Sequence, residues 1–243
     1  MTLEFLPIQH VPEIQPETDL ARSLADAIRV SGLELLETDI LAVTQKIVSK
    51  AEGRIVLLES VEPSDESLAI ARRMSKDPRL VELIRRESRR IVRMRGEVII
   101  CETHHGFICA NAGIDQSNVN GTATVTLLPK DPDRSARELA RVLGCGIIIT
   151  DTFGRAWREG LVDVAIGIAG VPPFIDFRGK TDAFGHDLRV TLLAAADALS
   201  AGAGLAMGKI SRTPAAIIRG FEWEKAESHA GALLRPIEKD LFL

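Results

Sequence analysis

Two stretches of the sequence surround one carboxylate with small and polar residues, a composition that suits ligand binding. "ICANAGIDQSNVNG", from Ile108 to Gly121, holds Asp115 among carboxamides and has few long apolar side chains. "IIITDTFGRAWREG", from Ile147 to Gly160, places Asp151 directly after an apolar run that is typical of a buried strand. Hard divalent cations prefer oxygen ligands, often beside substrate phosphates, so both aspartates are candidate metal ligands. Taken alone, either aspartate also fits a turn or a helix cap.

Cationic residues lie near Asp151 and in one further segment of the chain. Arg155, Trp157 and Arg158 follow Asp151 closely, and arginine binds carboxylate or phosphate as a fork. We therefore expect these three residues to recognise an anionic, ring-bearing substrate. Two lysines flank "IVS" after another apolar run, and lysine suits phosphate as a point charge. These lysines are Lys46 and Lys50. The alternative interpretation is that they lie in a solvated loop.

Standard nucleotide-binding and zinc motifs are missing. "GAGLAMGKIS" approaches the P-loop pattern, but Ala203 and Ile210 stand where a glycine and a hydroxyl residue are required. Gly208 is better explained as a helix end, with Lys209 near the negative end of the helix dipole. No G-x-G-x-x-G lies between a strand and a helix, which disfavours a dinucleotide fold. His104 and His105 are adjacent, and neighbouring side chains in a strand point apart, so we expect exposed turn residues.

Composition places the chain among soluble globular proteins. Its 243 residues are 46% apolar and 26% charged, with a net charge of −4. Without a basic excess we expect no nucleic-acid partner, and the arginine-rich run "LIRRESRRIVRMRGE" is interpreted as a solvated helix face. Three irregularly spaced cysteines predict buried free thiols in a reducing compartment. The chain shows no signal-peptide pattern and no apolar run of about 20 residues, so we expect a cytoplasmic protein without membrane partners.

Periodicity predicts a mixture of helices and strands without a regular βαβ repeat, that is, an α+β or complex α/β fold. Strands are expected at residues 3–8, at 40–43 (followed by a polar turn), at 54–61, 145–152, 162–170 and 214–220. Helices are expected at 18–32 (with Thr18 as its cap), 64–92 (broken at Asp77-Pro78), 133–144 and 185–208. Residues 97–113 predict a hairpin that turns at 103–106. No linker divides the chain, so we expect residues 1–243 to form one catalytic region, with any subdomains packed closely.

Six motifs in order give the chain a family resemblance. They are "VTQKIVSKAEGR", "CANAGIDQSN", "LPKDPDRSARELA", "ITDTFGRAWREGLVDVAIGIAG", "FRGKTDAFGHDLRVT" and "GLAMGKISRTPAAIIRG". Together they resemble the coenzyme F420-0:L-glutamate ligase (F420 γ-glutamyl ligase) family, over roughly residues 3–220. The stand-alone form of this family lacks the C-terminal reductase-like domain found in some actinobacterial members, and this chain resembles that form.

The resemblance implies a GTP-dependent ligation in the cytoplasm. GTP would activate the phospholactate carboxylate of the deazaflavin F420-0 as an acyl phosphate, and L-glutamate would displace phosphate to form an amide. Further γ-linked glutamates could follow. The family uses Mn²⁺ or Mg²⁺, often with K⁺, and has an unusual α+β fold that forms an intertwined homodimer.

The resemblance also assigns residues. Asp115, Asp151 and Thr152 match metal ligands, and some family members have a ligating Glu or Gln where this chain has Lys209. Charged lysine cannot ligate, so either a second metal is missing or Lys209 acts directly on the phosphates, which makes Asp115, Asp151 and Lys209 the candidate catalytic residues. No general base is evident. The positions matching the nucleotide site are Val11, Pro12, Glu13, Ile14, Gln45, Lys46, Lys50, Asn118, Met207, Gly208 and Lys209.

Two alternatives remain at the level of sequence. One is a metal-dependent ligase of the same fold that acts on another carboxylate. The other is a catalytically silent protein that binds a nucleotide or F420, an interpretation that rests on Lys209.

Overall fold

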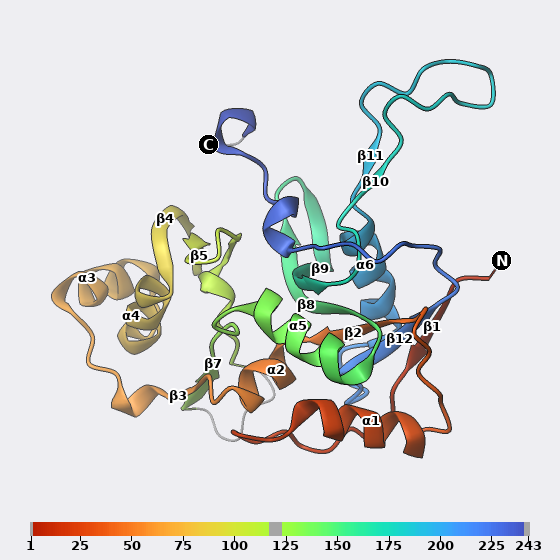
Figure 1. Cartoon of the computed structure of the whole chain (residues 1–243). Coiled ribbons are helices and arrows are strands. Elements are labelled where there is room, and N and C mark those ends of the chain that lie inside the picture. Colours follow the sequence, from red (N-terminus) through yellow and green to blue (C-terminus); the bar gives the residue numbers. More distant parts are fainter. Residues whose placement is uncertain (1, 117–122, 241–243) are drawn as a thin grey trace.

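A five-stranded sheet forms the centre of the computed structural model, which describes residues 2–116 and 123–240 (Figure 1). Its order is β1 (Glu4–Pro7), β12 (Ala215–Arg219), β2 (Ile40–Thr44), β8 (Gly146–Arg155) and β9 (Arg158–Ala169). Only β2 and β8 pair in parallel within this sheet. The inner strands β12 and β2 and the first half of β8 are buried, which explains why they appear in the sequence as continuous apolar runs.

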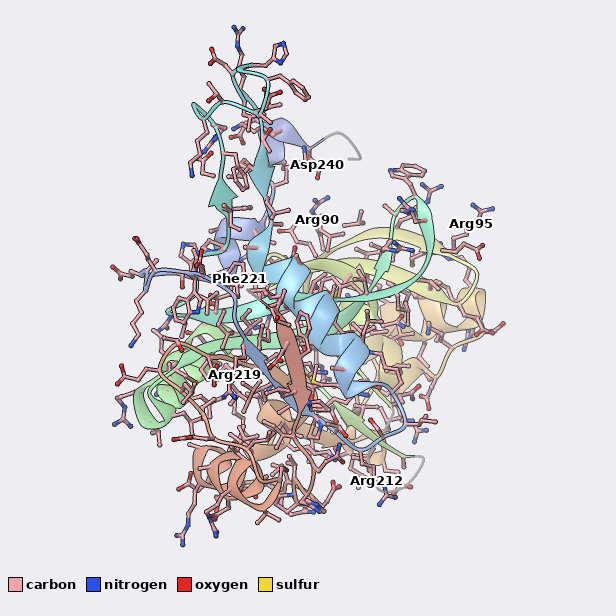
Figure 2. All side chains as sticks on the ribbon, turned by 90° about the vertical axis from the view of Figure 1, so that its right-hand side faces the viewer. Arg90, Arg95, Arg212, Arg219, Phe221 and Asp240 are labelled. Atoms are coloured by element: carbon pink, nitrogen blue, oxygen red, sulfur yellow. The ribbon has the colours of Figure 1, made fainter. Side chains whose placement is uncertain are left out.

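Helices cover both faces of this sheet. Helix α5 (Pro132–Leu143) packs against β8 and β9, and α1 (Leu20–Val30) packs beside it. Helix α6 (Ala195–Met207) packs against β9, β12 and β1 on the other face (Figures 1 and 2). Two glycines allow these close contacts: a Cβ on Gly167 would meet the Pro132 carbonyl at 2.5 Å, and one on Gly204 would meet Asp163 Oδ2 at 2.3 Å.

A smaller body with its own hydrophobic cluster lies beside β8 and β9. It contains the antiparallel pair β3 (Ile55–Leu57) and β7 (Thr124–Thr126). It also contains the three-stranded sheet of β4 (Ser88–Arg95), β5 (Val98–Thr103) and β6 (Ile108–Ala110). Helices α3 (Asp65–Met74) and α4 (Pro78–Arg86) cover it, with single 3-10 turns at η1 (Leu58–Ser60) and η2 (Asn111–Gly113). Helix α2 (Gln45–Ala51) connects β2 to this body.

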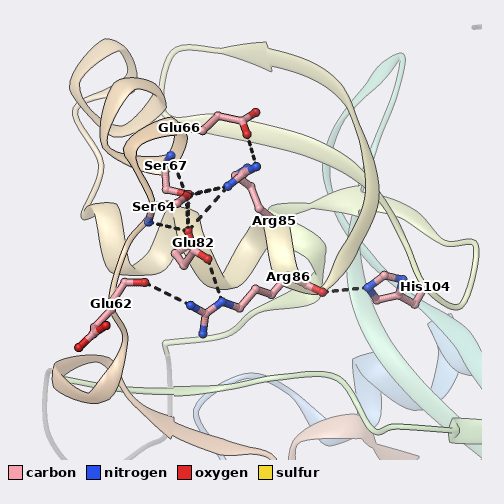
Figure 3. Close-up of polar contacts among 8 residues, drawn as sticks. All are labelled: Glu62, Ser64, Glu66, Ser67, Glu82, Arg85, Arg86 and His104. Carbon is pink, nitrogen blue, oxygen red and sulfur yellow. Dashed lines mark hydrogen bonds and ion pairs between the residues drawn. The ribbon is translucent and has the colours of Figure 1, made fainter.

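A buried carboxylate organises the helical side of the smaller body (Figure 3). Glu82 Oε2 accepts hydrogen bonds from the Ser64 backbone N–H at 3.0 Å, the Ser64 hydroxyl at 2.7 Å and the Ser67 hydroxyl at 2.7 Å. Arg86 Nε donates to Oε1 at 2.8 Å. These bonds, chiefly those from Ser64, lower the pKa of Glu82 to about 2. One charged side chain thereby joins the start of α3 to α4.

A narrow arm extends from the body between β9 and α6 (Figure 1). It contains β10 (Ile175–Asp176) and β11 (Leu192–Leu193), and its apolar residues Phe184 and Val190 are both 87% exposed. The C-terminal segment adds the 3-10 turns η3 (Ala230–Leu233) and η4 (Ile237–Lys239). In the described part of the chain, no helix has the length and apolar character needed to cross a bilayer.

Most of the expected elements are confirmed, and the fold is a mixed α/β arrangement with several small sheets. The hairpin turn at 103–106, the break at Asp77-Pro78 and the three buried free cysteines agree with the sequence predictions. Asp77 caps α4 by accepting a hydrogen bond from the Arg79 N–H at 2.9 Å.

Four local predictions are wrong. The cap of α1 is Asp19, which accepts from the Arg22 N–H at 3.0 Å, instead of Thr18. The polar segment after β2 is the helix α2, because its apolar residues Ile47 and Val48 pack into the core. The helix expected through residue 92 ends at Arg86, and the arginine run continues as strand β4. The helix expected from residue 185 begins only at Ala195, because residues before it belong to the arm.

Candidate active site

The carboxyl ends of the parallel strands β2 and β8 bring the predicted site residues to one edge of the sheet. Lys46 lies in the first turn of α2, directly after β2. Asp151 and Thr152 lie in β8, directly after Thr150, which is the last residue of β8 that pairs with β2. Asp115 reaches this edge because its backbone forms a two-way bridge with Thr126 of β7, at 2.8 and 2.9 Å. Asp115 and Asp151, 36 positions apart in sequence, therefore belong to one site.

The first half of the site contains Asp151, Asp115 and Lys46. The Thr152 backbone N–H donates to Asp151 Oδ1 at 2.8 Å, and Lys46 Nζ lies 2.7 Å from Asp115 Oδ2. Burial raises the pKa of Asp151 to about 7, with smaller upward contributions from the negative charges of Asp115 and Asp163, while the Thr152 N–H and Lys46 oppose the shift. Asp151 is therefore a dehydrated carboxyl group that lies close enough to two other acids for their charges to act on it.

The second half of the site contains Thr152, Asp163 and Lys209. The Thr152 hydroxyl donates to Asp163 Oδ1 at 2.7 Å. Lys209 Nζ donates to the same Asp163 oxygen and to the Thr152 hydroxyl, both at 2.8 Å. The Asp163 side chain is only 5% exposed, whereas that of Lys209 is 60% exposed. Gly204 of α6 leaves the space that the second Asp163 oxygen occupies.

The two halves lie on opposite faces of the β8–β9 hairpin. Thr152 pairs with Asp163 and Asp151 pairs with Val164, and successive strand residues point to opposite faces. The Thr152 and Asp163 side chains therefore face α6, and the Asp151 side chain faces the side of α5 and β6. The Thr152 backbone N–H donates a hydrogen bond to Asp151, and the Thr152 hydroxyl donates one to Asp163 in the other half of the site.

The predicted nucleotide positions lie along the same edge in three segments. Lys50 Nζ, largely buried, forms an ion pair with Glu13 at 2.6 Å, which attaches the segment Val11–Ile14 to α2. Gln45 is buried, its Oε1 accepts from the Ser49 hydroxyl at 2.8 Å, and its Nε2 has no hydrogen-bond partner among the described residues. Met207 and Gly208 end α6 beside Lys209. Asn118 lies outside the described residues.

Arg155, Trp157 and Arg158 occupy the exposed tip of the β8–β9 hairpin, four or more residues beyond Asp151. The Arg155 guanidinium donates to the Glu159 carbonyl oxygen, which holds it within the tip. The tip lies beyond Asp151 along the hairpin, and the role of these three residues in substrate binding stays a prediction.

Two hollows on the surface lie away from these residues. One of about 460 Å³ is lined by Phe221, Trp223 and their neighbours, where β12 ends and β2 begins. Figure 2 labels Arg212 and Phe221 near the two ends of β12, and the Lys209 segment is at the Arg212 end. The other, of about 320 Å³, lies between α1 and α5. The catalytic assignment therefore depends on the convergence of charged groups and not on cavity size.

Comparison with known proteins decides the family. A family model described as F420-0:Gamma-glutamyl ligase matches residues 9–220. The chain belongs to this ligase family. Coenzyme F420:L-glutamate ligase of Methanothermobacter thermautotrophicus is 44% identical over 251 residues, covering 100% of this chain and 99% of that protein. The ligase of Methanopyrus kandleri is 44% identical over 252 residues (99% and 98% covered), and that of Natronomonas pharaonis is 40% identical over 245 residues (98% and 93% covered). The family resemblance found in the motifs is confirmed.

Sequence reasoning missed Asp163. The residue lies in "GLVDVAIG", a lone acid in an otherwise small and apolar strand, and a buried acid of this kind is a signal for an interaction partner. Its partners, Thr152 and Lys209, are 11 and 46 positions away, and the pairing register that unites them includes a bulge between Ile149 and Thr150. We therefore add Asp163 to the candidate site as the residue that orients Thr152 and Lys209.

Replacing Lys209 with glutamine tests how this lysine acts. In Lys209→Gln the charge of Asp163 is no longer balanced, so we expect the divalent-metal concentration for half-maximal activity to fall severalfold. Stability should change by less than about 1 kcal/mol, because the lysine end of the ion pair is exposed. Activity titrated with Mn²⁺, together with the melting temperature, is the measurement. An unchanged metal titration would place Lys209 outside the site, and a Lys239→Gln variant, in η4, is the matched control.

Proposed function

We propose that this chain uses GTP to activate the free carboxylate of F420-0 and then ligates L-glutamate to it, with release of GDP and phosphate. Membership of the family makes the chain a ligase that adds glutamate to F420-0. The proposal concerns the nucleotide, the intermediate and the residues involved. The convergence of Asp115, Asp151 and Lys46 at one sheet edge is the observation that supports it most strongly.

The chemistry consists of two displacements. A carboxylate oxygen of F420-0 attacks the γ-phosphorus of GTP, which forms an acyl phosphate and releases GDP. The neutral amine of L-glutamate then attacks the acyl carbon, phosphate leaves, and the nitrogen loses one proton and keeps the other as the amide forms. Both steps bring anions together, so fixed cations in the site lower the barrier by electrostatic stabilisation. We propose that Lys46, which pairs with Asp115, supplies this charge beside Asp151, and that Lys209 supplies it from the face that carries Thr152 and Asp163.

A divalent cation, Mn²⁺ or Mg²⁺, fits the donor set. The carboxyl oxygens of Asp115 and Asp151 are ligands that such cations prefer, and the charge of Asp115 contributes to the raised pKa of Asp151, which is due mainly to burial. Within the described ranges, no three His, Cys, Asp or Glu side chains form a complete metal centre, so phosphate oxygens would have to complete the coordination. Such a cation would screen the terminal phosphates and polarise them toward attack. We propose Asp115 and Asp151 as its ligands, with Thr152 holding Asp151 through its N–H.

One assay tests the proposal and separates it from the alternatives. Purified protein is incubated with F420-0, L-glutamate, GTP and Mn²⁺, with and without K⁺, and the products are identified by mass. Glutamylated F420 formed in step with GDP supports the proposal. GDP release only with a different carboxylic acid indicates another acceptor, and nucleotide binding without turnover indicates a silent protein.

We also infer that two copies of the chain form a homodimer through the arm. The arm extends beyond the body, its sheet has only two short strands, and Phe184 and Val190 are exposed on it (Figure 1). An isolated two-stranded hairpin is marginally stable, and exposed apolar side chains mark protein interfaces. Analytical ultracentrifugation should give twice the chain mass for the wild type and a monomer for Phe184→Asp with Val190→Asp. A monomeric wild-type protein would refute the inference.

A further inference from the structure

The smaller body carries a surplus of positive charge that the catalytic site does not use. Between Arg72 and Arg95 the sequence has ten basic residues and three acidic ones, although the whole chain has a net charge of −4. The three acids are Asp77, Glu82 and Glu87, and each forms an ion pair with an arginine. Asp77 holds Arg79, Glu82 holds Arg86 with two serines, and Glu87 holds Arg54.

Part of this surplus is not neutralised by neighbouring acids. Arg85 pairs with Glu66, and Arg89 and Arg90 share Glu102, which leaves five residues for which the described structure contains no ion pair. Arg73 donates to Met94 Sδ at 3.5 Å, so the last turn of α3 lies against the end of β4. Figure 2 shows Arg95 at the outer edge of the molecule. Arg93 and Arg95 share the face of β4 opposite to Met94, and we call these two residues the basic surface; the other three, on α3 and just after it, are Arg72, Arg73 and Lys76.

The basic surface is connected to the catalytic edge by the three-stranded sheet. In the register of this sheet Ile91 pairs with Cys101, and Cys101 pairs with Cys109. Strand β6, which carries Cys109, lies against β8, and the charge of Asp151 adds to burial in raising the pKa of the Cys109 thiol to about 12. Neighbouring strands are about 4.8 Å apart, so Ile91 lies only about 10 Å from Cys109. Arg93 pairs with Ile100, which pairs with Ala110 next to Cys109, so Arg93 is likewise about 10 Å from β6. The basic surface is therefore within reach of a substrate that extends from the site along β6.

The reaction itself generates a ligand for such a surface. Each ligation consumes one carboxylate and introduces a glutamate with two, so the acceptor gains one negative charge with every round. When a glutamylated acceptor returns for another round, its terminal carboxylate must occupy the reacting position while the older part of the tail extends outward. Cations along that path stabilise the longer tail more than the shorter one.

We propose that the basic surface binds the anionic γ-glutamyl tail of an acceptor that already carries glutamate, and thereby favours further additions. This inference rests on the proposed function. The overall negative charge of the chain and the small extent of the surface favour a short anionic tail over a nucleic acid, which needs a longer basic stripe.

The test is a charge reversal, Arg93→Glu with Arg95→Glu. Initial rates are measured separately with F420-0 and with its singly glutamylated product as acceptor. We expect kcat/KM for the glutamylated acceptor to fall about tenfold relative to that for F420-0. The reason is that the attraction of Arg93 and Arg95 for the tail carboxylates is replaced by repulsion from two glutamates. The difference should shrink at high salt. The control, Arg22→Glu with Arg141→Glu on α1 and α5, changes the charge equally and should leave the ratio unaltered. Equal effects on both acceptors would overturn the inference.

A binding measurement keeps the inference separate from the proposed function. A fluorescent γ-linked triglutamate peptide is titrated with wild-type protein and with the two charge-reversed variants, followed by anisotropy. We expect binding by the wild type and by the control, and its loss in the Arg93/Arg95 variant. If a single-stranded oligonucleotide of equal charge bound more tightly than the peptide, or if both variants bound the peptide alike, the basic surface would not be a tail site. Absence of any ligase activity, by contrast, would refute the proposed function alone.

Discussion

Asp151→Asn is expected to lower kcat by at least about a thousandfold while the protein stays folded. The substitution deletes one negative charge and changes little volume, so a cation shared with Asp115 loses a ligand and the reacting phosphates lose their screening. Transition-state charge stabilisation by a bound cation amounts to several kcal/mol, and each 1.36 kcal/mol is a factor of ten in rate. Because Asp151 sits near Asp115 and Asp163, neutralising it removes repulsion, and the melting temperature of the metal-free variant should equal or exceed that of the wild type.

The measurement combines steady-state rates with a direct assay of Mn²⁺ binding by electron paramagnetic resonance. Asp26→Asn is the matched control: the same chemical change on the exposed face of α1, where Asp26 pairs only with Arg29. It should leave both rate and Mn²⁺ affinity unchanged. Near-normal turnover in the Asp151 variant would show that this carboxylate is not a ligand, and the proposed site would have to be abandoned.

The parts of the fold that sequence patterns predicted are those in which one local rule dominates. Strands β2 and β12 and the first half of β8 are buried on both faces, so their apolar runs are continuous. Helix α5 begins at an Asp-Pro pair and ends at Gly144, with Asp131 as its cap. Asp115 and Asp151 were chosen as candidate ligands for the small and polar residues around them, and the structure brings them close together. Taken alone each also fits a turn or a cap, so their role as ligands stays a prediction.

The parts that were missed depend on tertiary contacts. Helix α2 has a polar sequence, and only the core that receives Ile47 and Val48 makes it helical. Strand β4 is an edge strand with irregular pairing between Ser88 and Arg90 and between Ile91 and Arg93, so its apolar residues do not alternate regularly. Asp163 reaches the site through the pairing of β8 with β9, which places it opposite Thr152. A short stretch of sequence does not reveal that pairing. The division of the site between two faces of the β8–β9 hairpin follows from that same register.

Glu82→Gln is expected to reduce the stability of the protein by about 2 to 4 kcal/mol at pH 7. The amide keeps the shape of the side chain, but it replaces one acceptor with a donor and removes the charge that binds Arg86 and the two serine hydroxyls. Breaking a buried, charge-assisted network leaves its remaining members without partners, and that loss is larger than the removal of a surface ion pair. Glu97→Gln, in the exposed turn after β4, is the matched control and should change stability by less than about 0.5 kcal/mol.

The effect of Glu82 should depend on pH in a defined direction. Its pKa in the folded protein, about 2, lies below the ordinary glutamate value of 4.5, so the folded state binds fewer protons than the unfolded state between these values. The stabilisation by Glu82 is therefore complete above pH 4.5 and disappears as the pH falls toward 2. Urea unfolding at pH 7, 4 and 3 should show the wild type and Glu82→Gln converging as the pH falls. A gap that stays constant over this range would mean that the carboxylate charge does not hold α3 to α4, and that packing alone joins them.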